Sequence, residues 1–159
     1  MKSALLFTKS IRIFLKNIAT LWFIGYLPYA PGTWGSLAGL IFVLSAKWAL
    51  TFHPLIIVVA GIVIGIIASH VAERVICDPD SPYIIIDEFM GFLVAVYSIP
   101  HSYGYLVMAF LLFRFFDILK PLAISKLERT LSGGLGIMAD DILAGIYTNI
   151  IIHLWTKIF

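Results

Sequence analysis

Apolar residues run along this chain in long stretches that charged residues interrupt at only a few places. A membrane-spanning helix needs about 20 mostly apolar residues, with about 17 as the short limit. The second stretch, LIIVVAGIVIGIIAS, is the clearest, and the full set of predicted spans is 36–52, 54–72, 86–99, 103–119 and 141–156. The pattern therefore predicts an all-α, polytopic membrane bundle with about four to five transmembrane helices.

Residues 1–20 show a different pattern, in which four lysine or arginine residues are spread among apolar positions and no acid occurs. A basic amphipathic helix of this kind lies on an anionic membrane surface. The spread of the charges and the lack of a cleavage site argue against a signal peptide. We predict an interfacial amphipathic helix over 1–20, with a short helix packed on the bundle as the alternative. Residues 21–159 complete a single membrane-embedded domain spanning 1–159.

Residues 21–35, LWFIGYLPYAPGTWG, contain two prolines and three glycines, which predict an irregular loop. Aromatic residues of the kinds found there concentrate at the membrane interface, so we place the loop at the headgroup level. Two small-xxx-small pairs follow, Gly35 with Gly39 and Gly61 with Gly65. Such pairs let helices approach one another closely.

The composition agrees with a membrane protein and excludes other classes. Hydrophobic residues make up 61% of the chain and charged residues 13%, whereas soluble domains have roughly 45–50% and about 25%. The length of 159 residues leaves no room for a separate soluble domain beside the predicted spans. Cys77 is the only cysteine, which excludes a disulfide within the chain.

The few charges gather on one side of the predicted membrane. With the basic N-terminus inside, segments 1–35, 73–87 and 113–141 hold nine of the eleven lysine and arginine residues, including Lys126 and Arg129. Only Lys47 and Lys157 lie toward the outer side, as do His53, His101 and His153. This asymmetry follows the positive-inside rule, and it predicts that the segments rich in lysine and arginine face the cytoplasm. All nine acids share that face: Glu73, Asp78, Asp80, Asp87, Glu88, Asp117, Glu128, Asp140 and Asp141.

Five of these acids come from three separated segments at span ends. Asp87 and Glu88 lie between apolar residues in YIIIDEFMGF, where a buried carboxylate pair is costly unless a cation compensates it. Asp117 lies in FRFFDILKP, and Asp140 and Asp141 follow the glycine-rich SGGLGIMA, which predicts a loop running into a helix start. Backbone N–H groups at such a start can face an anion. Each group also has a simpler interpretation, as helix caps facing water or as a salt-bridged helix end.

The residue types in this set favour phosphate chemistry with a hard metal ion. Mg²⁺ is typically held by one or two carboxylates together with substrate phosphate. The chain has no Cys/His cluster for zinc, and its histidines lie mostly on the other face, away from a serine–histidine–aspartate set. Arg114 and Lys120 flank Asp117 and can neutralise phosphate charge. A substrate at this depth would be amphiphilic, with its headgroup in the cluster.

Four segments closely resemble, in order and in spacing, the motifs of the phosphatidylglycerophosphatase A family: GYLPYAPGTWGS (25–36), DPDSPYIIIDEFMG (78–91), FRFFDILKP (113–121) and GGLGIMADDILAGIY (133–147). The resemblance covers about a third of the chain. It implies a Mg²⁺-dependent lipid phosphatase of the bacterial inner membrane. Such an enzyme converts phosphatidylglycerophosphate into phosphatidylglycerol and inorganic phosphate, with its active site on the cytoplasmic face.

The resemblance also implies roles for individual residues. It carries a phosphate-binding role onto Lys120, and catalytic and metal-binding roles onto Asp87, Glu88, Asp117, Asp140 and Asp141. Arg114, Thr33 and Ser36 are further candidates for the phosphate or headgroup, although the first motif can also serve as an aromatic interface anchor. The chain departs from the family after Lys120, where Leu122-Ala123-Ile124 replaces the usual x-Pro-Ile. This loosens a turn and removes no ligand.

Two mechanisms and three other functions stay open at this point. Water attacks with a carboxylate as base, or an aspartate attacks and forms an aspartyl-phosphate. The main alternative is another Mg²⁺-dependent membrane enzyme of phospholipid headgroups, although the D-G-x₂-A-R pattern of headgroup phosphotransferases is absent. A small transporter subunit is disfavoured, because ion pathways place ionisable groups near the bilayer midplane. The third is a non-catalytic assembly subunit. We expect no nucleic-acid partner; the number of metal ions and the oligomeric state stay open.

Overall fold

A computed structural model describes residues 2–45, 54–100, 102–121 and 131–158 of the protein. The described residues form helices and no strands, which confirms the all-α class. The α-helices are α1 (Lys2–Ala19), α2 (Pro31–Ser45), α4 (Pro54–Ile76), α5 (Ile86–Ala95), α6 (Tyr103–Leu119) and α8 (Gly134–Ile158), and a 3₁₀ helix, η1 (Ile24–Tyr26), lies between the first two.

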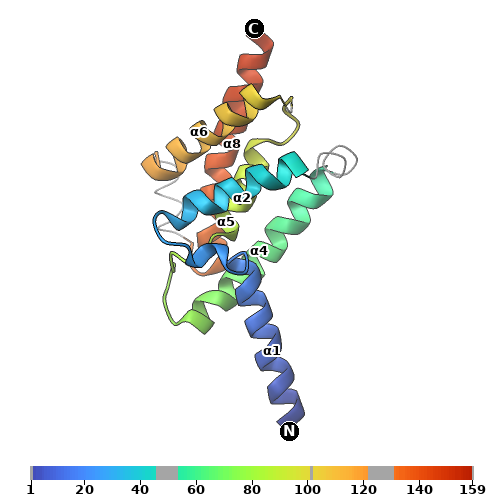
Figure 1. Cartoon of the computed structure of the whole chain (residues 1–159), viewed down its shortest axis with the longest axis vertical. Helices are drawn as coiled ribbons and strands as arrows, with labels where there is room; N and C mark the ends of the chain where they lie inside the picture. The colour runs from blue at the N-terminus through green and yellow to red at the C-terminus, as the bar shows by residue number, and fades with distance from the viewer. Residues whose placement is uncertain (1, 46–53, 101, 122–130, 159) are drawn as a thin grey trace.

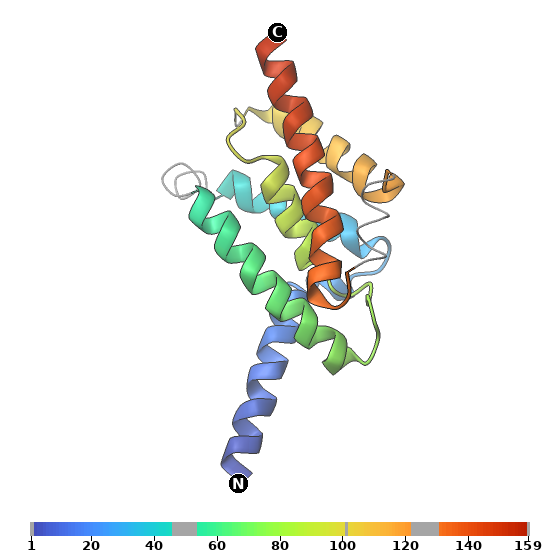
Figure 2. The ribbon, with the colours of Figure 1, turned by 180° about the vertical axis from the view of Figure 1, so that it is seen from behind.

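The short helix α5 lies at the centre of the bundle and contacts each of the other described α-helices. Helix α2 lies in front of α5 in Figure 1 and α8 lies in front in the reverse view of Figure 2, while α4 and α6 flank the bundle on opposite sides in both views. The first helix, α1, projects away from the bundle, so that the two chain ends lie at opposite ends of the molecule. Its helical state agrees with the prediction for 1–20, while its place at a membrane surface stays a prediction.

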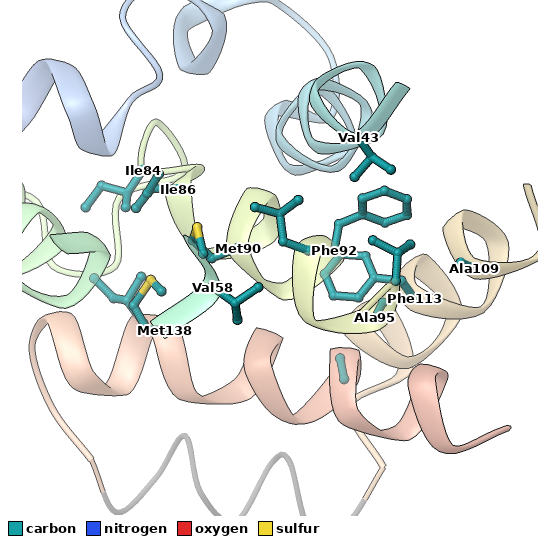
Figure 3. Close-up of a cluster of buried hydrophobic side chains, with 14 of the residues drawn as sticks. Val43, Val58, Ile84, Ile86, Met90, Phe92, Ala95, Ala109, Phe113 and Met138 are labelled. Carbon is teal, nitrogen blue, oxygen red and sulfur yellow. The ribbon is translucent and has the colours of Figure 1, made fainter. Parts of the chain in front are cut away.

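The apolar core forms around α5, seven of whose ten residues are buried. Phe92 and Phe113 are fully buried and meet edge-on, with ring centroids 6.2 Å apart. Figure 3 shows them beside Val43 of α2, with Met90 and Met138 farther along the same core. A ten-residue helix is about 15 Å long, half the thickness of the hydrocarbon core. Helix α5 is thus a core helix that is too short to cross a bilayer by itself.

Two of the described helices are long and apolar enough to cross a membrane, over Leu55–Ile76 and Gly134–Ile158. Helix α2 is a shorter apolar helix, and α6 coincides with the predicted stretch 103–119. The predicted number of four to five spans is not confirmed by these helices. Large apolar side chains such as Ile56, Val63 and Leu111 are exposed on the outer faces, as expected where lipid replaces water.

Two predicted helix starts are wrong. Helix α2 begins at Pro31, inside the stretch that we expected to be irregular, and α8 begins at Gly134 rather than near 141. Proline suits the first position of a helix, where its missing N–H has no partner to lose. In α8, a Cβ at Gly134 would run into the backbone of α4 at Ile66 and His70. Glycine is therefore used here for close helix contact and not as a helix breaker.

Several predictions fall outside the described residues. These are the end of the first predicted span (46–52), the Leu122–Ile124 departure and the placement of Lys47, His53, His101, Lys126, Glu128 and Arg129.

The C-terminal end of α5 is held by a side chain of α8. Asn149 donates hydrogen bonds from its Nδ2 to the carbonyl oxygens of Ala95, at 3.1 Å, and Tyr97, at 2.7 Å. Carbonyls at the end of a helix lack partners within the helix. Asn149 supplies a donor to the last carbonyl of α5 and to the carbonyl two residues beyond it, and so links the end of α5 to α8.

Candidate active site

Three carboxylates from α5 and α8 form the centre of the site. Oxygen atoms of Asp87, Glu88 and Asp141 lie within 4.8 Å of one another. Asp87 is 9% exposed and Asp141 3% exposed. The side chains of Asp87 and Glu88 are in contact, both from the first turn of α5. Buried carboxylates so close together are costly unless a cation, a proton or a hydrogen-bond partner compensates their charge.

Two more carboxylates border this centre. Asp117 of α6 contacts the side chain of Asp141, and Asp140 precedes Asp141 on α8 and is 9% exposed. The five predicted acids therefore gather in one place, although they come from three helices that are distant in sequence.

Two basic residues neutralise the bordering carboxylates. Arg114 donates a hydrogen bond from Nη1 to Asp117 Oδ2 at 2.5 Å, one helical turn along α6. Lys120 Nζ lies 2.7 Å from Asp140 Oδ2 and so joins the end of α6 to α8. Lys120 itself ends α6 with a left-handed backbone conformation, at φ 39°. Both cations thus stand at the edge of the cluster, where a phosphate group could reach them.

The central carboxylates approach one another because two glycines let α5 and α8 touch. Gly91 lies one turn after Asp87 on α5, and Gly145 lies one turn after Asp141 on α8. A Cβ at Gly91 would stand 2.7 Å from the carbonyl oxygen of Asp141, and one at Gly145 would run into the carbonyl of Gly91. A side chain at either position would push the two helix backbones apart. The spacing of the carboxylates therefore depends on this crossing.

The first turn of α2 closes the other side of the cluster. A Cβ at Gly32 would collide with Oε1 of Glu88 and would lie 3.2 Å from Nη1 of Arg114. Ser36, which is fully buried, donates from Oγ to the Gly32 carbonyl at 2.9 Å and accepts from Arg114 Nη1 at 3.3 Å. Gly32 leaves space for Glu88, while Ser36 holds the guanidinium group of Arg114.

Some residues of the motif 25–36 lie at the site, and others lie on the surface of the protein. Thr33 is half-buried, and its backbone N–H donates to the Ala30 carbonyl at 2.9 Å. Trp34 is exposed and donates from Nε1 to the carbonyls of Pro28 and Tyr29, which closes the turn before α2. Tyr29 is 91% exposed and Phe23 80% exposed. The placement of residues 21–35 at the headgroup level stays a prediction, and the motif also reaches the carboxylates through Gly32 and Ser36.

One local expectation about the site is wrong. We expected Asp140 and Asp141 at a helix start, but α8 begins at Gly134, so that both lie in the second turn and are buried. Backbone N–H groups that far into a helix bond within the helix and cannot face an anion. The side chains, rather than the helix end, carry the chemistry here.

The donor set fits a hard divalent metal ion. One oxygen each of Asp87, Glu88, Asp140 and Asp141 is buried and has no hydrogen-bond partner among the described residues. Oxygen ligands from carboxylates suit Mg²⁺ and similar cations. A cation at the three central carboxylates would satisfy the oxygens of Asp87, Glu88 and Asp141 and offset their mutual repulsion. The cluster can thus bind a metal ion, and its geometry does not single out one element.

Sequence reasoning did not find Gly91, Gly145 or Gly32. A signal for the first two exists, because both acidic segments carry an aspartate followed by a glycine four residues later, Asp87–Gly91 and Asp141–Gly145. The role of Gly32 has no local signal, since it depends on contacts with α5 and α6.

The described residues form an all-α bundle in which two helices are long and apolar enough to cross a membrane. It carries a carboxylate cluster that could hold a metal ion, flanked by two cations. The family model described as phosphatidylglycerophosphatase A matches residues 17–156. The chain belongs to this family, as its motifs indicated, and it is an enzyme, a phosphatase.

Three proteins with two different names are similar in sequence to this chain. Phosphatidylglycerophosphatase A of Haemophilus influenzae is 38% identical over 138 residues, covering 80% of each chain. The Escherichia coli protein of the same name is 35% identical over 134 residues, covering 81% of this chain and 76% of its own. A Bacteroides thetaiotaomicron protein provisionally named phosphatidylinositol-3-phosphatase is 37% identical over 137 residues, covering 80% and 84%. No solved structure matches the chain.

Proposed function

We propose that this protein is a Mg²⁺-dependent phosphatase of phospholipid synthesis that removes the terminal phosphate of phosphatidylglycerophosphate. The observation that carries the proposal is the buried set of Asp87, Glu88 and Asp141, with oxygens within 4.8 Å of one another. Family membership supports the reaction and the lipid. The donor chemistry of the carboxylates supports Mg²⁺.

We assign the metal-binding role to the central carboxylates and to Asp117 and Asp140 at the border. Bound Mg²⁺ supplies charge neutralisation at the phosphoryl oxygens and makes water more acidic. Lys120 and Arg114 bind the remaining phosphate oxygens, each already held in place by an acidic partner. Thr33, beside this turn, is a further phosphate contact in the proposal. Ser36 acts through Arg114, because its buried hydroxyl already bonds to Gly32 and Arg114.

Hydrolysis breaks the bond between phosphorus and the glycerol oxygen and forms one to the attacking oxygen. A carboxylate of the cluster takes the proton of an attacking water, or an aspartate attacks directly and is released by water in a second step. The leaving alcohol is phosphatidylglycerol, which regains a proton. The buried carboxylates exclude bulk water from the reacting phosphate and hold the geometry on three helices.

The same proposal places the whole chain in the inner membrane as one domain with its site on the cytoplasmic side. The concentration of basic residues near the site supports this orientation. The basic helix α1 leaves the bundle beside the turn that carries Tyr26, where Lys16 Nζ lies 5.5 Å from the ring centroid. An anionic cytoplasmic surface attracts such a helix.

The deciding experiment measures phosphate release from phosphatidylglycerophosphate by the purified full chain in detergent micelles. EDTA should abolish release, and added Mg²⁺ should restore it. Asp141→Asn and Asp87→Asn should each lower kcat by about 100-fold or more, while Asp78→Asn, an exposed acid outside the cluster, should keep full activity. Unimpaired turnover in both cluster variants, or in EDTA, contradicts the assignment.

A second candidate substrate is a phosphoinositide, which the Bacteroides relative's name favours. Phosphatidylinositol 3-phosphate also carries a phosphate monoester on a hydroxylated headgroup. Parallel assays with both lipids decide between them through the ratio of kcat/KM values.

A further inference from the structure

A pocket of about 220 Å³ opens beside the candidate active site and has no role in the chemistry described so far. It lies between the end of α4, the turn after it and the start of α8. Its polar lining comes from Glu73, Asp80, Ser132 and Asp140, with the backbone of Gly133 and Gly136 completing the wall. Because Asp140 also pairs with Lys120, the pocket adjoins the place where we put the phosphate.

The lining determines which ligand the pocket favours. Three of its polar side chains are carboxylates, which repel a phosphate and accept hydrogen bonds. Ser132 has a hydroxyl that donates and accepts, and Gly136 lies in the first turn of α8, where backbone N–H groups lack helical partners. A neutral hydroxyl group, which both donates and accepts, matches both kinds of partner. An apolar tail or a second phosphate matches neither.

Asp140 gives an independent sign that this wall is incomplete. The residue is 9% exposed, and while Oδ2 accepts from Lys120, the buried Oδ1 has no hydrogen-bond partner among the described residues. Buried carboxylate oxygens are normally satisfied. Asp140, which lines the pocket, therefore has an acceptor to spare for a further donor.

A backbone hydrogen bond fixes the side chain of Glu73 at the opposite wall of the pocket. Its Oε1 accepts a hydrogen bond from the backbone N–H of Asp80 at 3.2 Å, and Asp80 has the left-handed conformation, at φ 51°. This contact ties the turn 77–80 to the end of α4. The carboxylate is thereby fixed at the pocket instead of moving freely in solvent.

We propose that this pocket binds the hydroxylated part of the lipid headgroup, the glycerol that carries the terminal phosphate, and so selects a polyol phosphate over other phosphomonoesters. The inference rests on the proposed function, since it places the leaving alcohol beside Lys120. Glu73, Asp80 and Ser132 are specificity-determining residues in this arrangement, and none of them belongs to the metal cluster.

The test compares two lipids that differ by one hydroxyl: phosphatidylglycerophosphate and an analogue in which propane-1,3-diol replaces the headgroup glycerol. Wild-type protein should prefer the natural lipid by about tenfold or more in kcat/KM, since a hydrogen bond to a charged group is broken in the analogue. Glu73→Gln and Ser132→Ala should each bring the ratio of the two kcat/KM values closer to one. The change should come chiefly from a higher KM for phosphatidylglycerophosphate.

Glu73→Gln keeps an oxygen acceptor for the Asp80 N–H and so preserves the turn. The matched control is Asp78→Asn, which likewise removes one carboxylate charge, from the turn just after α4, at an exposed residue outside the pocket lining. Its preference between the two lipids should equal that of the wild type.

Each other result overturns the inference. A wild-type protein that hydrolyses both lipids equally has no hydroxyl-selective pocket, and variants that keep the wild-type preference place the hydroxyl elsewhere. If the variants instead raise the half-saturating Mg²⁺ concentration with an unchanged preference, the pocket is a cation site. Failure of the wild type to hydrolyse either lipid contradicts the proposed function itself, which distinguishes the two failures.

Discussion

Helix α5 meets α8 on one face and α2 on the other, and the glycines nearest the carboxylates touch different atoms on the two faces. Against α8, a Cβ at Gly91 or Gly145 would meet backbone carbonyls. Against α2, a Cβ at Gly32 would meet the tip of Glu88, a side chain that can rotate away. Gly91 and Gly145 therefore set the distance between α5 and α8, whereas Gly32 sets the position of one carboxylate. The distance of α2 depends on Gly35 instead, where a Cβ would stand 2.8 Å from the carbonyl oxygen of Ile85. Substitutions on the two faces should separate folding from metal binding.

The largest effect is expected for Gly145→Ala on the α8 face. The new methyl group has to separate two backbones, which costs about 1–3 kcal/mol of stability. It also moves Asp141 relative to Asp87, and a displacement of about 1 Å can lower activity by about 100-fold. Thermal unfolding in detergent and phosphate release should fall together. A variant with normal stability and normal activity would show that the crossing is not a close contact.

Gly32→Ala on the α2 face should act mainly on the metal. The methyl group displaces Oε1 of Glu88 and crowds Arg114, whereas the backbone of α2 can stay in place. We expect the half-saturating Mg²⁺ concentration to rise by about tenfold, in the range for groups that support metal ligands, with little change in melting temperature. Direct Mn²⁺ binding, measured without substrate, should weaken in parallel. A fall in stability as large as that of Gly145→Ala would abolish the distinction between the two faces.

A smaller effect is expected for Ser36→Ala, which removes the hydroxyl between Gly32 and Arg114. Loss of one such hydrogen bond costs about 0.5–1.5 kcal/mol, or roughly 3- to 10-fold in kcat/KM for the phospholipid. Metal binding should remain normal, because Ser36 contacts no carboxylate in the bonds described above. Ser36→Thr, which retains the hydroxyl, should recover activity if the fully buried site accepts the added methyl group. Equal losses in metal affinity and lipid turnover would place Ser36 in the metal site instead.

The smallest effect is expected for Gly104→Ala, which serves as the control for both glycine variants. A Cβ at Gly104 would meet nothing within 4 Å. Its effect on stability should stay within about 0.5 kcal/mol, as for exposed positions elsewhere. Wild-type activity and melting temperature in this variant would show that loss of a glycine is harmful only where helices touch.

The fold was predictable where it depends on local apolarity. The range 103–119 coincides with α6, and α4 follows its predicted stretch with a few added residues at the end. The starts of α2 and α8 were missed because both contain glycines whose fit is decided by another helix. Gly134 faces α4, and Gly35 faces Ile85 and Glu88 of α5. Helix propensities and turn signals are read from neighbouring residues in the sequence, so they do not predict contacts with another helix.

Part of the site could be predicted because charged residues within an apolar stretch are costly to bury without a partner. Asp87 and Glu88 between apolar residues required a partner, and the family motifs pointed to Asp117, Asp140 and Asp141 as its other members. The pairing of Lys120 with Asp140 was not predicted, because it links two segments across the bundle. The burial of Ser36 was not predicted either, since a serine in a loop-like motif looks the same whether it faces solvent or α6.

Asn149 has a consequence for the way in which the chain is made. The ribosome delivers α5 before α8, yet two carbonyls at the end of α5 depend on a side chain of α8 for their donors. In hydrocarbon, such groups cannot be left unsatisfied without a cost of several kcal/mol. A nascent chain that stops short of residue 149 thus has an unfinished central helix. A chain truncated before residue 149 is therefore expected to be less stable than the full chain.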